Sequence, residues 1–356
     1  DVLRGVENTS GPLGQGHAMA LGAAIAERFL AARFGEWTAH RTYAYISDGS
    51  VEEEISQGVG RIAGHLGLSN FVMYYDANNV QLSTKVDEVD TIRNLGGDPE
   101  HPFAVFDESR EVFAERREAL RAWAAQQAAV EKSWRAEHKE LARRMDRFFS
   151  GELPEIDYKT IEVKPDVATR AASAAVLGVY AEKVGNMIVS SADLSNSDKT
   201  DGFLKKTRAF VKGDFSGQFF QAGVSELTMA CVMNGMALHG GVIPVCGTFF
   251  VFSDYMKPAV RLSALMRLHV IYVWSHDSFR VGEDGPTHQP VEQEAQIRLM
   301  EHVRNHRGER SMLVLRPADG DETVMAWKLA LEEQRPVALV LSRQNIRSLK
   351  TLATSR

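Results

Sequence analysis

Two short stretches near the start of the chain decide the fold: Ser47-Asp48-Gly49 and Asp76-Ala77-Asn78-Asn79-Val80. Each stretch follows a short β-prone run, Tyr43–Ile46 in the first case and Phe71–Tyr75 in the second. A helical pattern over Ile55–Leu66 separates the two runs, and strands that alternate with helices form parallel sheets. Ligands of such sheets bind at the carboxyl ends of the strands, where both polar turns would lie.

The oxygen atoms of these turns match the needs of a small, hard cation. Asp48 offers a carboxylate, Asn78 an amide oxygen and Val80 a backbone carbonyl. Mg2+ and Ca2+ take such ligands and leave positions for phosphate oxygens and water. The turns therefore predict a metal ion that holds a diphosphate. Asp-Gly and Asn-Asn are also common turn dipeptides, so a purely structural interpretation stays open at this point.

The bulk properties indicate a folded protein of more than one domain. The length of 356 residues favours two or three domains, and 44% hydrophobic residues argue against disorder. A net charge of -6 disfavours nucleic acid or an anionic membrane as a partner, and no apolar stretch is long enough to span a bilayer. Cys231 and Cys246 both have apolar neighbours, which fits reduced thiols in a cytoplasmic compartment.

The alternation of patterns divides the chain into two α/β units. Residues 1–150 form the first, which ends in a charged helical stretch over 107–149. Residues 151–165 form a linker, and residues 166–356 form a second, complete α/β domain. Its pattern predicts helices over 169–183, 226–238, 253–266, 293–305 and 322–333, and strands over 187–190, 242–245, 270–274, 311–316 and 337–342.

The first unit has too few strands for a closed core. Only two strand patterns precede the charged helical stretch, and a sheet of two strands leaves an exposed edge. We therefore expect residues to be missing between Thr91 and Ile92. Because the chain opens on Asp1 and not on Met, we also expect its true start to lie upstream.

Five motifs, in the order in which the family carries them, resemble transketolase over nearly the whole chain. They are Gly11-Pro12-Leu13-Gly14-Gln15-Gly16, Asp48-Gly49 with Asn78, Ser191-Ala192-Asp193-Leu194, Gly282-Glu283-Asp284-Gly285-Pro286-Thr287-His288-Gln289 and Leu341-Ser342-Arg343-Gln344-Asn345. The resemblance implies two parallel-sheet domains of the thiamine diphosphate-binding type, of which the first is incomplete here. The family's third, C-terminal domain and its histidines upstream of the Gly11 loop have no counterpart in the sequence.

The resemblance also implies the cofactors, thiamine diphosphate with Mg2+ (or Ca2+). Their metal ligands would be Asp48, Asn78 and Val80. The carboxyl of Glu226 would lie against the aminopyrimidine of the cofactor, where it shares a proton with the ring. Glu53 from a second copy of the chain would lie near it. The other implied cofactor-binding residues are Gly11, Leu13, Gly49, Asp193, Phe249, Phe252 and Tyr255, although an aromatic group at the helical spacing of the last three is also typical of a plain core.

Cationic and polar side chains of the second domain would bind a sugar phosphate. The resemblance implies the substrate-binding residues Arg170, Ser197, His276, Asp284, His288 and Arg343. Among these, His276 and His288 would also act in catalysis with Glu226 and Glu53, because histidine titrates near neutral pH. We expect His17, His40, His65 and His239 to be structural.

The implied activity is transfer of a two-carbon ketol unit from a ketose phosphate to an aldose phosphate through a dihydroxyethyl carbanion on thiamine diphosphate. The enzyme would serve the pentose phosphate pathway as a cytoplasmic homodimer with its active sites at the interface. Two alternatives stay open: a related enzyme of the deoxyxylulose phosphate synthase type, and a truncated or split non-catalytic module that needs further parts. The sequence does not select among sugar phosphates.

Overall fold

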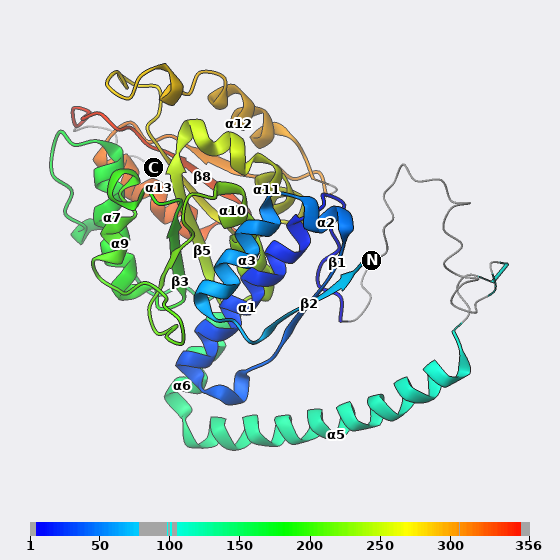
Figure 1. Ribbon diagram of the computed structural model, residues 1–356. Coiled ribbons are helices and arrows are strands. Elements are labelled where there is room, and N and C mark those ends of the chain that lie inside the picture. Colours follow the sequence, from blue (N-terminus) through cyan, green and yellow to red (C-terminus); the bar gives the residue numbers. More distant parts are fainter. Residues whose placement is uncertain (1–4, 78–97, 99, 102–104, 306, 350–356) are drawn as a thin grey trace.

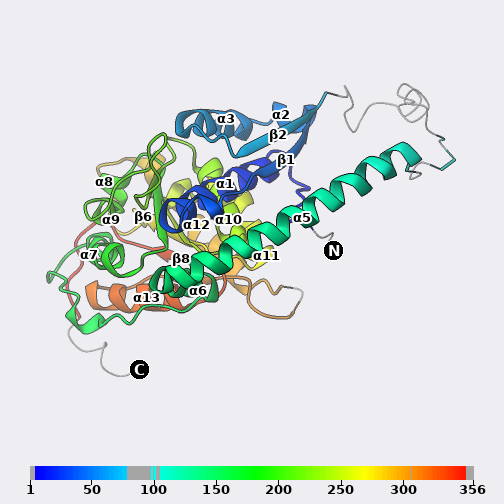
Figure 2. The same cartoon turned by 90° about the horizontal axis from the view of Figure 1, so that it is seen from below.

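Two parallel sheets form the framework of the chain (Figures 1 and 2). The computed structural model describes residues 5–77, 98, 100–101, 105–305 and 307–349. One sheet has the order β1-β2 and the other β4-β3-β5-β6-β8-β7, and all pairs of neighbouring strands are parallel. The α/β class predicted from the sequence is thereby confirmed.

The larger sheet forms the centre of the second domain. Every residue of β3, β6 and β8 is buried, as expected of a parallel sheet covered by helices on both faces. Strand β4 was not predicted, because it is only three residues long. In spatial order the strands are β4 (Phe219–Gln221), β3 (Met187–Ser191), β5 (Ile243–Phe249), β6 (Ile271–Ser275), β8 (Val337–Val340) and β7 (Leu313–Leu315).

Helices flank this sheet close to their predicted positions. One hydrophobic cluster includes Tyr180 and Trp327, and a second cluster includes Trp274 and side chains of the first unit. The five long helices are α7 (Thr169–Lys183), α10 (Glu226–His239), α11 (Ser253–Met266), α12 (Gln293–His302) and α13 (Gly320–Glu332). The short ones are η3 (Tyr158–Thr160), α8 (Ser195–Asp198), α9 (Asp201–Leu204), η4 (Phe250–Phe252) and η5 (Pro286–His288).

The first unit places the carboxyl ends of its two strands side by side. Strands β1 and β2 pair in a register that runs from Thr42 opposite Phe71 to Ser47 opposite Asp76. Because both strands end at this last pair, the residues that follow them start from neighbouring positions, as predicted. The elements of this unit are α1 (Gln15–Phe34), η1 (Glu36–Thr38), β1 (Thr42–Ser47), α2 (Asp48–Glu52), α3 (Ile55–Leu66) and β2 (Phe71–Asp76).

Helices α1 and α10 pack so closely that glycine is required at their contact. A Cβ atom on Gly22 would lie 2.0 Å from the carbonyl oxygen of Val232. A Cβ atom on Gly235 would lie 1.8 Å from the carbonyl oxygen of Met19. These contacts join the first unit to the second through a shared hydrophobic cluster.

Gly235→Ala is expected to lower the free energy of unfolding by about 3 kcal/mol, because a backbone carbonyl cannot move aside as a flexible side chain can. Gly60→Ala is the matched control. Gly60 is also inside a helix, but its added Cβ meets nothing within 4 Å, so this change should stabilise the protein by up to about 1 kcal/mol. Chemical denaturation of both variants measures the difference. Equal stabilities would contradict the close packing.

The charged stretch forms two helices, not one. Helix α5 (Asp107–Glu137) and helix α6 (Lys139–Ser150) meet at His138, whose φ of -119° and ψ of 56° interrupt the helix. No residue of α5 is buried, and the helix projects as an arm from the body of the molecule (Figures 1 and 2). Phe113 and Trp123 on this arm are 71% and 53% exposed. Within the described residues, every helix is too short or too polar to cross a membrane.

Aromatic side chains of the small sheet are exposed as well. The ring of Tyr74 stacks with those of Tyr43 and Tyr45, and Tyr45 is 82% exposed. An open aromatic face of this kind agrees with the prediction that the first unit is incomplete. The suspected gap between Thr91 and Ile92 lies outside the described residues.

Candidate active site

Asp48 lies at the carboxyl end of the small sheet, as predicted. It begins helix α2 directly after strand β1, and its neighbour Ser47 is paired with Asp76 of β2. The hydroxyl of Tyr75 donates a hydrogen bond to Oδ1 of Asp48, which orients the carboxylate. The other two predicted metal ligands, Asn78 and Val80, lie outside the described residues.

The glycine-rich loop lies against the Asp48 turn. A Cβ on Gly49 would be 3.1 Å from Cδ1 of Leu13, so the loop and the turn are in contact. Gly14 has a φ of 82°, and its added Cβ would be 3.1 Å from Cβ of Glu53. Gly11 has open space around it. The structure thus brings together Leu13, Gly49 and Glu53, three residues that the resemblance assigned to the site.

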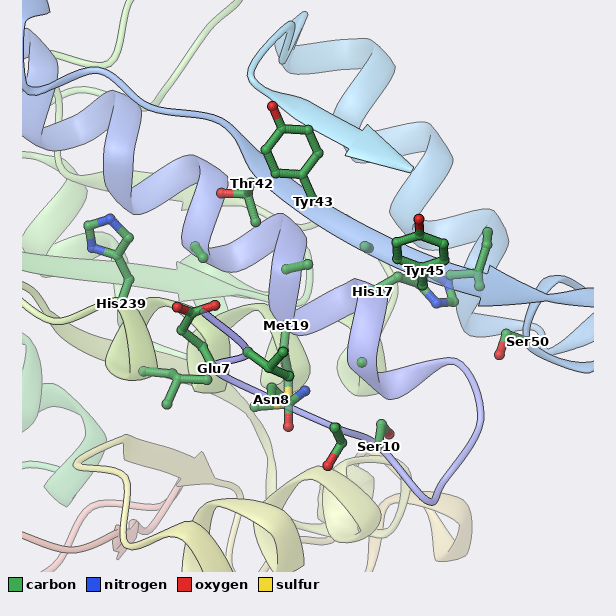
Figure 3. A pocket seen from close by; sticks show the side chains of 18 of the residues that line it. Glu7, Asn8, Ser10, His17, Met19, Thr42, Tyr43, Tyr45, Ser50 and His239 are labelled. Carbon is green, nitrogen blue, oxygen red and sulfur yellow. The ribbon is translucent and has the colours of Figure 1, made fainter. Parts of the chain in front are cut away.

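A cavity of about 930 Å³ opens beside this loop (Figure 3). It is lined by the segment 5–14, the start of α1, strand β1 and the end of α10. His17 lies on its wall, and its Nε2 is 2.8 Å from the hydroxyl of Ser56, which in turn donates to the carbonyl of Ser50. These contacts connect His17 through Ser56 to the backbone of α2, and the structural role of His17 stays a prediction.

Glu226 is the first residue of α10 in the second domain. Its carboxyl is partly withdrawn from water, and burial raises its pKa, while the Thr248 hydroxyl beside it acts in the opposite direction. Thr248 precedes Phe249 at the end of β5, so Glu226 lies next to the predicted aromatic group. A carboxyl with a raised pKa keeps its proton at a higher pH and can share it with a ring nitrogen.

Five rings gather after β5 and β6. The rings of Phe249 and Phe252 stack with centroids 5.8 Å apart, and the ring of Phe249 lies 3.6 Å from that of His276. The ring of Tyr255 stacks on Phe252 at 6.0 Å, and His288 meets Phe252 edge-on at 5.4 Å. Phe249, Phe252 and Tyr255 belong to a strand, a 3-10 helix and an α-helix, so their helical spacing in the sequence does not reflect one helix face.

The predicted substrate-binding residues converge beside these rings. Arg170 on α7 donates to the carbonyl of Ser197 at 2.7 Å and lies 3.3 Å from Nε2 of His276. Arg343 pairs with Glu283, and its Nε is 3.1 Å from Oδ2 of Asp284. Because Asp284 also lies 3.8 Å from His276, these groups form one continuous network from α7 to the chain segment after β8.

His276 does not titrate near neutral pH, contrary to the expectation from its residue type. Burial lowers its pKa to about 3, and the nearby charges of Arg170, Arg343 and His288 act in the same direction. The ring is therefore neutral at physiological pH. The hydroxyl of Ser275 is 2.9 Å from Nδ1, and the residue has a φ of 60°, so its orientation is tightly fixed. His276 is suited to hydrogen bonding and stacking more than to proton transfer.

Asp198 supports the site, and the sequence analysis missed it. Its buried carboxylate accepts hydrogen bonds from the Ser191 hydroxyl at 2.6 Å and from the Thr200 hydroxyl at 2.7 Å. Burial raises its pKa to about 6. The two hydrogen bonds of Asp198 fix the segment that carries Asp193 and Ser197. Within this segment the backbone of Asp193 is in the left-handed region, with a φ of 62°. The one signal in the sequence was an acidic residue shortly after the Ser191 motif.

The donor set fits thiamine diphosphate. On one side an acidic turn meets a glycine-rich loop, as a metal-bound diphosphate requires. On the other side an aromatic group lies beside a carboxyl with a raised pKa, which suits a protonated heteroaromatic ring. Within the described residues, no three acidic, histidine or cysteine side chains form a metal site.

Fold and site define a thiamine diphosphate-binding α/β protein, and comparisons with known proteins agree. The family model "Transketolase, thiamine diphosphate binding domain" matches residues 1–91, and "Transketolase, pyrimidine binding domain" matches residues 165–348. The chain belongs to the transketolase family.

Curated and solved relatives agree with this assignment. The chain is 36% identical to the transketolase of Halalkalibacterium halodurans, over 97% of this chain and 63% of that protein. It is also 36% identical to the transketolase of Bacillus subtilis, over 96% of this chain and 62% of that protein. The transketolase structure from Leishmania mexicana superposes with a TM-score of 0.85 at 31% identity, over 98% of this chain and 63% of that one.

The comparison of lengths bears on the incomplete first unit. The chain spans less than two thirds of the curated relatives that it matches. The alignment with the Halalkalibacterium halodurans protein runs over 435 positions, more than the 356 residues of this chain, so that protein contains internal residues that have no counterpart here. The first family model ends at residue 91, where we predicted the gap.

Proposed function

We propose that the protein transfers a two-carbon ketol unit from a ketose phosphate to an aldose phosphate. The observation that carries this proposal is the network of Arg170, Ser197, His276, Asp284 and Arg343 beside the aromatic group. The guanidinium groups of Arg170 and Arg343 at one end of this network suit a phosphate, because arginine binds phosphate oxygens with two parallel hydrogen bonds. The neutral histidine and the carboxylate are placed to bind sugar hydroxyls.

Each residue of the candidate site has its own task in the proposed reaction. Thiamine diphosphate supplies the electron sink when it is bound. Glu226 holds a proton at the aminopyrimidine ring, and the rings of Phe249, Phe252 and Tyr255 exclude water from it. His276 and Asp284 bind the sugar hydroxyls, and Asp284 reads their stereochemistry, while His288 lies with the groups that bind the phosphate end. Arg170, Ser197 and Arg343 bind the phosphate end and thereby fix the substrate along the site.

The metal, the assembly and the compartment are part of the proposal. Mg2+ (or Ca2+) would be held by Asp48 together with Asn78 and Val80. Glu53 lies with the Asp48 turn, whereas Glu226 begins helix α10 of the second domain. We propose a homodimer in which Glu53 of one copy and Glu226 of the other complete each active site, working in the cytoplasm in the pentose phosphate pathway.

One assay separates this function from its rivals. The purified chain is given thiamine diphosphate and Mg2+, with sedoheptulose 7-phosphate as ketol donor and an aldose phosphate as acceptor. A transketolase from Pichia stipitis has been solved with this donor at 29% identity and a TM-score of 0.82, over 98% of this chain and 63% of that one. Transfer supports the proposal. Turnover of pyruvate instead would favour the deoxyxylulose phosphate synthase type.

A non-catalytic or partner-dependent module is the second candidate. The exposed tyrosines of β1 and β2 favour it, because a complete domain would cover them. Binding of thiamine diphosphate without ketol transfer by the chain alone would support this candidate over the enzyme.

A further inference from the structure

Two histidines from distant parts of the chain meet at the edge of the large cavity. His40 lies just before strand β1, and His239 is the last residue of helix α10. Their Nε2 atoms are 3.2 Å apart, and their ring centroids are separated by 5.1 Å with nearly parallel planes. Both residues line the cavity of Figure 3, and His40 is exposed. The function proposed above uses neither of them.

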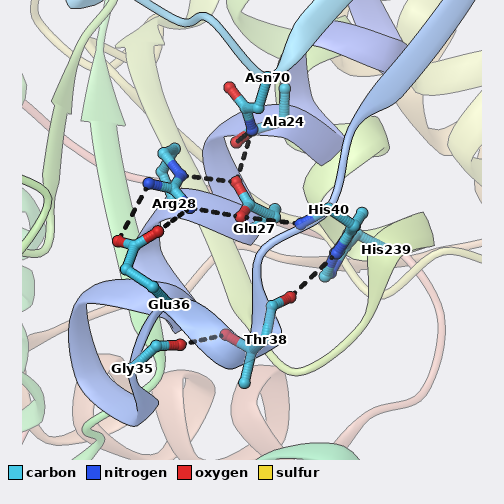
Figure 4. Close-up of polar contacts among 9 residues, drawn as sticks. All are labelled: Ala24, Glu27, Arg28, Gly35, Glu36, Thr38, His40, Asn70 and His239. Carbon is cyan, nitrogen blue, oxygen red and sulfur yellow. Dashed lines mark hydrogen bonds and ion pairs between the residues drawn. The ribbon is translucent and has the colours of Figure 1, made fainter. Parts of the chain in front are cut away.

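The hydrogen bonds of both rings fix their tautomers. Nδ1 of His40 is 3.2 Å from the carbonyl oxygen of Thr38 (Figure 4), and Nδ1 of His239 is 3.1 Å from the carbonyl oxygen of Gly240. A carbonyl oxygen only accepts, so each Nδ1 must carry the hydrogen. A neutral imidazole has one N–H, and both Nε2 atoms therefore present lone pairs toward each other. Such an arrangement needs a cation near the two nitrogen atoms.

The surroundings favour a metal ion over an additional proton. Glu27 is buried, and its Oε1 accepts the backbone N–H of His40 at 3.2 Å, which fixes that residue in place. Its charge is already paired with Arg28 at 2.6 Å, and Asn70 donates to its Oε2 at 2.5 Å (Figure 4).

We propose that His40 and His239 together bind Zn2+. Two Zn–N bonds of about 2.0–2.1 Å that meet at a tetrahedral angle place the nitrogen atoms about 3.3 Å apart, close to the observed 3.2 Å. Metal-bound histidines commonly donate their other N–H to a backbone carbonyl, as both do here. Among the described residues no third histidine, cysteine or carboxylate joins the pair, so water from the cavity completes the shell. The ion would link the first unit to α10.

Calorimetric titration of the full, tag-free chain with ZnCl2 tests the site. Excess Mg2+ is present throughout, because it prefers oxygen ligands and occupies the Asp48 turn. We expect one Zn2+ per chain. His40→Ala or His239→Ala should weaken binding by at least about 10–100-fold, the loss seen even when only an outer partner of a metal ligand is removed. His65→Ala removes an exposed histidine of α3 and should change nothing.

NMR spectra and Tm give two further measurements, which begin with the wild-type protein. In NMR spectra of histidine-labelled chain, the ring signals of two histidines should shift together on addition of Zn2+, and EDTA should reverse the shift. Zn2+ should also raise Tm, with no such rise in the His40→Ala, His239→Ala double variant. Equal Zn2+ affinity in the wild type and the double variant overturns the proposal. Absence of Zn2+ binding to the wild type also overturns the proposal, and would mean that the two Nε2 atoms share a proton. Neither result bears on ketol transfer.

Discussion

Glu226→Gln is expected to lower the rate of ketol transfer by about 10²–10⁴-fold while the protein remains folded. Glutamine keeps the shape of the side chain and its capacity for hydrogen bonds at the start of α10, but its amide neither gives up nor takes a proton, as the exchange with the aminopyrimidine ring requires. Steady-state rates with saturating thiamine diphosphate and Mg2+ measure the loss. Asp321→Asn removes an exposed carboxyl from the first turn of α13 and is the control, with an unchanged rate.

The stability of the Glu226→Gln variant gives an independent check. Burial raises the pKa of Glu226 in the folded state, so the ionised carboxylate costs stability at pH values above that pKa. Glutamine removes this cost, and Tm near neutral pH should stay equal or rise. The difference should shrink as the pH falls below the raised pKa and vanish below the ordinary pKa of glutamate, where the wild-type carboxyl is neutral in both the folded and the unfolded protein. Unimpaired transfer, or a loss of rate that accompanies unfolding, would refute the role of Glu226.

Asp48→Asn is expected to weaken the Mg2+-dependent binding of thiamine diphosphate by on the order of 100-fold. The change removes one negative charge from the metal site but keeps the side chain in its place at the start of α2. Calorimetric titration with thiamine diphosphate, with and without Mg2+, measures the loss. Tyr75→Phe should have a smaller effect in the same direction, because the Tyr75 hydroxyl only orients the carboxylate.

Asp107→Asn is the control for this prediction. Asp107 also lies in the first turn of a helix, but on the exposed arm α5, so cofactor affinity should not change. Unchanged affinity in Asp48→Asn as well would leave Asp48-Gly49 with the role of a plain turn.

The sequence was sufficient for what depends on local patterns. Period and composition predicted the helices and strands of the second domain to within a few residues. The family resemblance implied one substrate site for Arg170, Ser197 and His276, which lie in contact in the structure. Strand β4 was missed, since three residues show no period. The break at His138 was missed too, because the charged pattern continues through it.

Properties that arise from distant contacts could not be predicted. The low pKa of His276 results from burial and from arginines on α7 and after β8, none of which is local to the residue. Likewise, His40 and His239 approach each other only because α1 and α10 pack together, so neither residue showed a signal of its own. The proposed ligands Asn78 and Val80 lie outside the described residues and stay predictions.

The glycine contact between α1 and α10 has a consequence for biosynthesis. Helix α1 is made long before α10, yet the two helices share one hydrophobic cluster, so part of the surface that α1 buries is covered only when α10 has been made. Until then its apolar side chains, such as Phe29 and Leu21, are open to other nascent chains. Helix α1 therefore reaches its native packing, through Gly22 and Gly235, only after α10 has been synthesised. A chaperone that shields α1 during translation would raise the yield of folded protein.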